Sequence, residues 1–262
     1  MTDWLDDPDT LEEQYADASN LNARIALHEG YSTADREFHP WIFDQFELPD
    51  DARVLTLGCG PGKLWETNAE RVPDGWTVAV TDRSRGMVTE ARTTLADHAD
   101  AFAFGVADAQ WIPFADDRFD AVTANHVLYH IPDREAALRE IRRVLVPGGR
   151  LYATTIGDRH MQERIDVEER VADEALVSGG THFSLENGGE QLRAVFDDVA
   201  VHPYDDALRV TDVEPLVAYA LSRNEFDDSM APELHAAFER EFEDGVFHVE
   251  KDVGMFVARK RS

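Results

Sequence analysis

Short apolar runs alternate with helix-patterned segments through the first part of the chain. Continuous apolar stretches predict strands at 53–57, 76–81, 101–106, 119–124 and 150–156. Segments whose apolar residues recur three or four positions apart predict helices at 63–71, 84–97 and 133–145, the last ended by Pro147-Gly148-Gly149. Such alternation of strands and helices is typical of a parallel, doubly wound sheet with right-handed crossovers.

The segment before the first strand is predicted to be helical. Residues 1–50 carry helical patterns at about 10–28 and 35–46, with several aromatic residues between them. We interpret this segment as a cap over the site at the end of the sheet, although packing of helices on the sheet edge would give the same pattern.

The part that follows the fifth predicted strand mixes helices with two further strands. VEERVADEALVSGG predicts a helix that ends at Gly179-Gly180. The remaining patterns predict helices at about 187–196, 212–222 and 231–243, and strands at 198–204 and 246–258. We therefore divide the chain into a cap (1–50), a core (51–157), a helical insertion over the site (158–190) and a C-terminal part of the sheet (191–262).

Three glycines follow the first predicted strand and supply the strongest indication of chemistry. VLTLGCGPGKLW places Gly58, Gly60 and Gly62 in the spacing G-x-G-x-G, and Asp82 ends the next predicted strand. Glycine allows the backbone to turn sharply and lets a ligand approach where a Cβ would collide. Asp82 is placed to accept hydrogen bonds from ribose hydroxyls, as in nucleotide sites at the carboxyl edge of a parallel sheet.

The glycine spacing distinguishes between nucleotide-type ligands. A dinucleotide-binding loop usually reads G-x-G-x-x-G, whereas the third glycine comes one residue earlier here. Gly62-Lys63 is followed by Leu64, so the lysine pattern of a phosphate-binding loop is not completed. A nicotinamide-dinucleotide-binding oxidoreductase is therefore disfavoured, but it stays the alternative.

Two further motifs complete a family resemblance. VADAQWIPFADDRFD occupies 106–120, and AVTANHVLYHIPDREAALREIRRVLVPGG occupies 121–149. Together with the glycine loop, this region from about 54 to 153 resembles class I S-adenosylmethionine-dependent methyltransferases of the type 11-like group. The resemblance implies a Rossmann-like, seven-stranded, mostly parallel sheet with an antiparallel last strand. It also implies methyl transfer from S-adenosyl-L-methionine to a small molecule by in-line displacement, or a cofactor-binding protein without turnover.

The resemblance also assigns cofactor-binding roles to individual residues. The glycine loop, with Cys59, would pass under the methionine and ribose, and Asp82 with the adjacent Arg83 would meet the ribose. The expected cofactor-binding residues are Gly58, Cys59, Gly60, Gly62, Asp82, Arg83, Met87, Asp108, Ala109, Asn125 and His126. Two of them have competing interpretations, because Met87 could simply fill the core and Asp82 could cap the following helix.

Candidate catalytic and substrate-binding residues follow the fourth strand and occur in the cap. His126 and His130 could act as a general base, since a histidine titrates near neutral pH, or they could have a structural role. The predicted substrate contacts are Arg24, His28, Tyr31 and Tyr129, with His160 and His182 as further candidates. No histidine pair has the spacing of a metal site, so we predict no metal.

Acidic residues dominate the charge of the chain. The net charge is −28 over 262 residues, and lysine occurs only at Lys63, Lys251 and Lys260. Dense carboxylates keep a surface hydrated when molar salt screens their repulsion, so we predict a protein of a halophile, with an ordinary acidic cytosolic enzyme as the alternative. The same charge disfavours nucleic acid as a partner, because nucleic-acid binding needs a basic patch.

The sequence lacks a membrane span and a signal-peptide pattern, and it has a single cysteine. No apolar stretch approaches the ~20 residues of a membrane span, and MTDWLDDPDT does not have the pattern of a signal peptide. We therefore expect a cytoplasmic protein without membrane contact. Cys59 is the only cysteine, and its place between two glycines favours a tight turn over a nucleophile. The patterns leave open which atom is methylated and whether the chain forms oligomers.

Overall fold

One mixed sheet organises the part of the chain that the computed structural model describes, which is residues 19–172, 176, 182–223 and 225–261. Its seven strands run in the order β3-β2-β1-β4-β5-β7-β6. The strands are β1 (Arg53–Leu57), β2 (Thr77–Asp82), β3 (Phe102–Val106), β4 (Phe119–Asn125), β5 (Leu145–Ile156), β6 (Asp198–Val210) and β7 (Phe247–Arg259). The pairs from β3 to β5 are parallel, whereas β7 is antiparallel to both β5 and β6, which confirms the predicted fold class.

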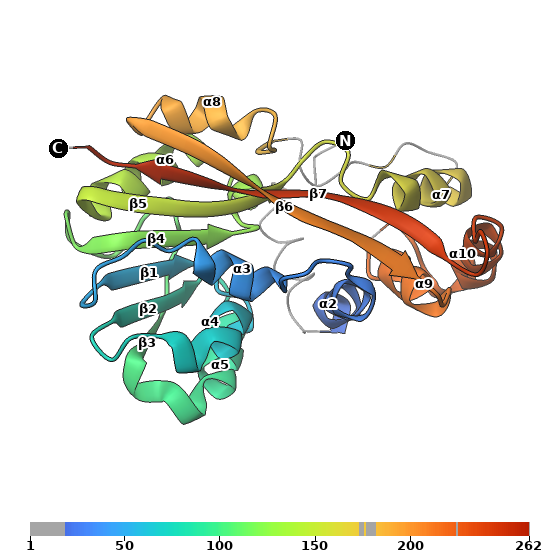
Figure 1. The fold of residues 1–262 in the computed structure, drawn as a ribbon, viewed down its shortest axis with the longest axis horizontal. Coiled ribbons are helices and arrows are strands. Elements are labelled where there is room, and N and C mark those ends of the chain that lie inside the picture. Colours follow the sequence, from blue (N-terminus) through green and yellow to red (C-terminus); the bar gives the residue numbers. More distant parts are fainter. Residues whose placement is uncertain (1–18, 173–175, 177–181, 224, 262) are drawn as a thin grey trace.

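Helices cover both faces of this sheet (Figure 1). They are α3 (Phe38–Asp44), α4 (Lys63–Asn68), α5 (Arg85–Thr94), α6 (Arg134–Val144) and α8 (Gly188–Arg193). Successive side chains of a strand point to opposite faces, and β1 shows the result. Val54 packs with α3, α4 and α5, whereas Leu55 and Leu57 pack with α6 and α8.

The last two strands continue beyond the rest of the sheet. β6 and β7 pair from Asp198↔Arg259 to Val210↔Phe247, but β5 follows β7 only as far as Ile156↔Val253. Figure 1 shows these long strands reaching the helices α2 (Ser19–Tyr31), α7 (Gln162–Ala172), α9 (Glu214–Leu221) and α10 (Ala231–Glu239). A separate hydrophobic cluster, which includes Leu208, Leu216 and Phe238, holds this helical end together.

Several predicted boundaries are wrong. The sixth strand, predicted to end at 204, continues to Val210, and helix α7 begins at Gln162 and not at 167. β5 begins directly after α6, so Pro147-Gly148-Gly149 lies within that strand and does not end the helix. The pairing of β4 with β5 shifts register there, and Gly148 has a φ of +86°, which accommodates the irregularity.

Other predictions are not tested. The predicted helix end at Gly179-Gly180 and the beginning of the first predicted helix fall outside the described residues. The division of the chain at 50, 157 and 190 stays a prediction. Among the described helices, none combines the length and the apolar character that crossing a membrane requires.

Candidate active site

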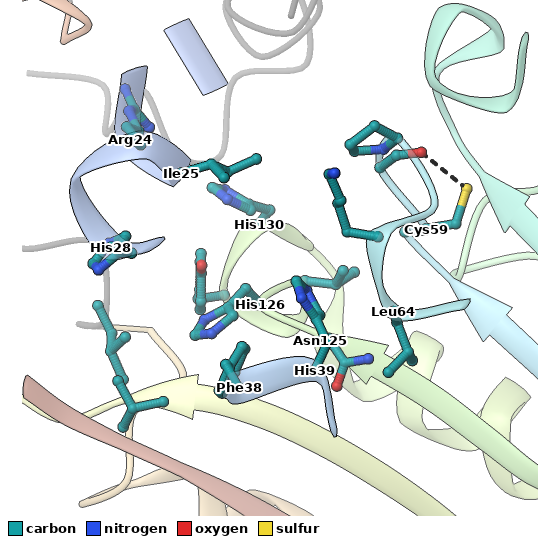
Figure 2. A pocket seen from close by; sticks show the side chains of 18 of the residues that line it. Arg24, Ile25, His28, Phe38, His39, Cys59, Leu64, Asn125, His126 and His130 are labelled. Atoms are coloured by element: carbon teal, nitrogen blue, oxygen red, sulfur yellow. Dashed lines mark hydrogen bonds between the residues drawn. The ribbon is translucent and has the colours of Figure 1, made fainter. Parts of the chain in front are cut away.

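A cavity of about 930 Å³ lies where the carboxyl ends of β1, β2 and β4 face the helical end of the molecule. We call its two parts the loop side, lined by residues such as Gly60 and Asp82, and the α2 side, lined by residues such as Arg24 and His28. Figure 2 draws Arg24 and His28 on one side of the pocket and Cys59, in the glycine loop, on the opposite side.

The glycine loop has the backbone conformation that requires glycine. Gly58, Gly60 and Gly62 have backbone φ angles of +65°, +52° and +89°, which residues with a Cβ rarely adopt. A Cβ at Gly58 would lie 2.3 Å from Val127 Cγ2, whereas a Cβ at Gly60 would meet no protein atom within 4 Å. Gly60 therefore presents bare backbone to the cavity, while Gly62 precedes the first residue of α4 and does not line the cavity.

Asp82 joins the glycine loop to the end of β2. The Gly60 N–H donates to Asp82 Oδ2 at 3.0 Å, and the Ser84 N–H donates to Asp82 Oδ1 at 2.8 Å. Burial raises the pKa of this carboxyl above its ordinary value, although these hydrogen bonds favour the ionised form. Ser84 is the cap of α5 and accepts from the Met87 N–H, so the interpretation of Asp82 as the helix cap is wrong.

The other predicted cofactor residues on the loop side also line the cavity. The lining includes Gly58, Cys59, Gly60, Asp82, Arg83, Met87, Asp108, Ala109, Asn125 and His126. Asp108 Oδ1 accepts from the Gln110 N–H at 2.8 Å, which fixes the carboxylate at the end of its loop. The Asn125 Oδ1 atom is buried and has no hydrogen-bond partner within the described protein. A buried acceptor of this kind indicates a donor supplied by a ligand.

Cys59 has no sign of a reactive thiol. Its Sγ lies 3.3 Å from the Gly60 carbonyl oxygen, and its backbone N–H donates to Thr81 O at 2.9 Å. Burial and the nearby Asp82 raise the pKa of the thiol far above its ordinary value. The thiol therefore stays protonated at neutral pH, which agrees with a turn role rather than a nucleophilic one.

His126 occupies a strained position at the end of β4. Its φ is +53°, and its N–H donates to Thr154 O at 3.1 Å and to Thr154 Oγ1 at 3.2 Å. Its ring centroid is 5.4 Å from that of Phe38. Burial, with a smaller contribution from Lys251, lowers the pKa of His126 to about 3. An imidazole of such low basicity is a poor general base at neutral pH, which argues against that role for His126.

His130 and Tyr129 stay candidates for contact with the acceptor. Both line the cavity from the short 3₁₀ turn Leu128–His130, and their ring centroids are 4.5 Å apart. No finding tests a catalytic role for His130, which stays a prediction.

On the α2 side, some of the predicted substrate-binding residues line the cavity and others do not. Arg24, His28 and His160 line the cavity, but Tyr31 and His182 do not. Tyr31 packs against the hydrophobic cluster of the helical end. Further lining residues were not predicted from the sequence, and they include Arg164, Tyr204, Tyr219, Arg223 and Lys251. One signal was available for Lys251, because it is one of only three lysines in the chain.

The glycine loop and the two motifs at 106–120 and 121–149 lie within a region that known proteins share. The model of the methyltransferase domain family matches residues 55–153. The C-methyltransferase UbiE of ubiquinone and menaquinone biosynthesis from Hahella chejuensis is 37% identical over 171 residues, 64% of this chain and 68% of that protein. The chain belongs to the class I S-adenosylmethionine-dependent methyltransferases.

Two other similar proteins show how much of the chain the similarity covers. A trans-aconitate 2-methyltransferase of Variovorax paradoxus is 29% identical over 245 residues, 85% of this chain and 88% of that protein. The structure of phosphoethanolamine N-methyltransferase 2 of Haemonchus contortus with S-adenosyl-L-methionine matches with a TM-score of 0.61 and 19% identity, over 97% of this chain and 60% of that one. The chain spans 34% to 63% of the lengths of other matching curated relatives.

The loop side of the methyltransferase fits the cofactor of its family. Gly60 leaves room where a Cβ would stand, and Asn125 Oδ1 lacks a donor. Asp82 and Asp108 present carboxylates that retain lone pairs beyond their backbone contacts. In the described part of the chain, no group of three or more histidine, cysteine or acidic side chains is arranged to hold a metal.

Proposed function

We propose that this chain transfers a methyl group from S-adenosylmethionine to a small-molecule acceptor by in-line displacement. The observation that carries this proposal is that the Gly60 backbone and Asp82 line the same cavity as the residues of the α2 side. The family membership and the match to a relative named for trans-aconitate support a small acceptor.

The loop side would hold the cofactor through a few defined groups. When bound, S-adenosylmethionine supplies a methyl group on a positively charged sulfur. Asp82 would accept from the ribose hydroxyls, and Asp108 would accept from the adenine amino group. Asn125 Oδ1 would accept from the amino end, and Met87, only 4% exposed, would pack on the adenine.

The α2 side would orient the acceptor and exclude water. Positioning a nucleophile within ~3–3.5 Å of the reacting carbon supplies most of what such a displacement needs from a protein. Because His126 is a poor base, we propose that the acceptor brings a nucleophile that needs no deprotonation by this residue. His130, Tyr129, Arg24 and His28 are the remaining candidates for contact with the acceptor.

The other functions considered from the sequence have less support. The family membership favours the methyl donor over a nicotinamide dinucleotide. A binding protein without turnover differs from an enzyme only in the absence of product. Incubation with labelled methyl donor and a metabolite extract, followed by identification of the labelled product, separates these two possibilities.

We further propose that the protein works in the cytoplasm of a halophile and that its acceptor is not a nucleic acid. The net charge of −28 supports a halophilic origin and an acceptor other than nucleic acid, since it favours solubility in molar salt and opposes binding to phosphate backbones.

Calorimetric titration with S-adenosylmethionine or S-adenosylhomocysteine tests the proposed function. The wild-type protein should bind both, and Asp82→Ala should weaken binding by about 2–3 kcal/mol because it removes charged hydrogen bonds. Asp100→Ala, at an exposed position on the 3₁₀ turn Ala96–Ala101, is the matched control and should bind as the wild type does. Absence of binding by the wild type would refute the proposal.

A further inference from the structure

Basic side chains gather on the α2 side of the cavity, although the chain as a whole is strongly acidic. Arg24, Arg164, Arg223 and Lys251 all line it. Lys251 is one of three lysines in a chain of net charge −28. Removing a cation from water is costly unless a negative charge lies beside it. A basic side chain that lacks such a partner in the protein therefore indicates a place where an anionic ligand can bind.

Lys251 is already paired within the protein. It forms an ion pair with Asp206, and the side chains of both residues are buried. Asp206 Oδ1 also accepts from Ser32 Oγ at 2.7 Å and from the Thr33 N–H at 3.1 Å. This carboxylate is fully engaged, and Lys251 needs no ligand to balance its charge.

Arg164 and Arg223 are paired as well. Arg164 forms a buried ion pair with Glu168, one turn further along α7. Arg223 Nη1 lies 3.7 Å from Glu168 Oε2, and Arg223 Nη2 lies 3.0 Å from Glu225 Oε1. Among the described residues, these two arginines therefore face two carboxylates.

Arg24 differs from the other three cations. Its Nε donates to Ser222 Oγ at 2.9 Å and its Nη2 donates to Ser222 O at 2.8 Å, so both partners are neutral. Within the described part of the chain, no carboxylate lies within 4.0 Å of its guanidinium. Ser222 thus fixes the position of the guanidinium without balancing its charge.

The histidines near Arg24 also lie close to positively charged side chains. His28 lies four residues after Arg24 in α2, on the same face of the helix, and its Nδ1 is buried without a hydrogen-bond partner. Burial lowers the pKa of His28 well below its ordinary value, and Lys251, His126, Arg164 and Arg24 lower it further. Because its pKa is this low, His28 is neutral near neutral pH and can share a hydrogen bond with a ligand.

His160 is a second neutral histidine, and it lies beside His28. Its ring centroid is 6.3 Å from that of His28, and the two rings are stacked. The Asp252 N–H donates to His160 Nδ1 at 3.2 Å, which leaves the proton of the neutral ring on Nε2.

We propose that the α2 side binds an anionic group of the methyl acceptor, a carboxylate or a phosphate, with Arg24 as its counter-ion and His28 as a hydrogen-bonding neighbour. This inference rests on the proposed methyl transfer. The planar guanidinium matches both groups, since its N–H donors can bind two oxygens at once. Among the described residues, Arg24 is the cation of this side that has no carboxylate partner, and the anion would balance its charge.

Calorimetric titration with simple probes tests this assignment, with and without S-adenosylhomocysteine at constant ionic strength. The probes are benzoate, phenyl phosphate and benzamide, the last being a neutral analogue of benzoate. At least one anion should bind about tenfold or more tightly than benzamide, as expected for one charge-assisted contact. Comparison of benzoate with phenyl phosphate identifies which anionic group the site prefers.

Two substitutions locate the effect. Arg24→Gln should abolish the preference for the anion and leave the affinity for S-adenosylhomocysteine unchanged, which also shows that the variant is folded. Arg24→Lys should retain part of the preference, because it keeps the charge. Arg209→Gln, an equal change of charge at an exposed position of β6, should have no effect.

The outcomes are distinguishable from failure of the proposed function. Equal binding of benzamide and the anions, no anion binding, or an unchanged preference in Arg24→Gln would each overturn the anionic assignment. Failure of the wild type to bind S-adenosylhomocysteine would instead contradict methyl transfer, and it is measured separately.

Discussion

At the scale of single residues, Gly60 shows how a local motif leaves bare backbone at the cavity. Its φ of +52° allows the loop to turn, and the space beside its Cα is open toward the cavity. Asp82 fixes the turn by accepting from the Gly60 N–H at 3.0 Å. These features involve residues that are close in sequence or at fixed spacing, so the motif predicted them.

Substitution of Gly60 by alanine separates the conformational role from the binding role. Gly60→Ala and Gly245→Ala should each cost about 1 kcal/mol of stability, because both sites have left-handed backbone and no atom near the new Cβ. Only Gly60→Ala should weaken binding of S-adenosylhomocysteine, by about tenfold or more. Thermal unfolding and calorimetry measure the two effects. Equal affinities of the two variants would contradict the close approach of a ligand at Gly60.

The α2 side could not be predicted in the same way. Arg24 and Ser222 are separated by 198 positions, and their hydrogen bonds depend on how α2 packs beside α9. Arg164 and Lys251 come from α7 and β7, and no spacing rule joins them. Arg24, His28 and Tyr31 were predicted because they lie in the helical segment before the first strand, but Tyr31 packs against the hydrophobic cluster of the helical end.

At the scale of elements, the long strands β6 and β7 supply Tyr204, Asp206 and Lys251 to the lining of the cavity. The sequence predicted the core strands because their apolar runs are continuous. The outer half of β6 was missed because polar residues such as Asp205 and Asp206 interrupt its apolar positions. The structure shows alternating burial there, with Leu208 and Val210 facing the helical end.

A buried ion-pair group connects α7 to the chain that follows α9. Glu168 is fully buried and faces both Arg164 and Arg223. Glu168→Gln should lower the free energy of unfolding by about 3–5 kcal/mol, because it leaves two buried arginines short of a counter-charge. Urea denaturation measures the change.

An exposed pair in α6 is the control for that measurement. Glu135→Gln breaks the contact with Arg139, which lies four residues away on the surface, and should cost less than about 1 kcal/mol. A comparable small loss in Glu168→Gln would mean that the group contributes little to the helical end.

At the scale of the whole molecule, charge is distributed unevenly between surface and cavity. The chain carries a net charge of −28, yet four basic side chains line the α2 side. Repulsion among surface carboxylates destabilises the folded state at low salt and is screened over ~3 Å at 1 M.

Unfolding measured against potassium chloride tests the halophilic proposal. The free energy of unfolding should rise from low salt to molar salt, since screening removes the repulsion among carboxylates. Maximal stability at low salt would favour an ordinary acidic protein.

The central claim is that one cavity holds the methyl donor between the glycine loop and the carboxylates of β2 and the loop after β3. A crystal structure with S-adenosylhomocysteine tests it most directly. The account predicts the ribose against Asp82, the adenine against Asp108 and the amino end at Asn125. A ligand bound elsewhere, or a loop at 58–62 turned away from Asp82, would contradict it.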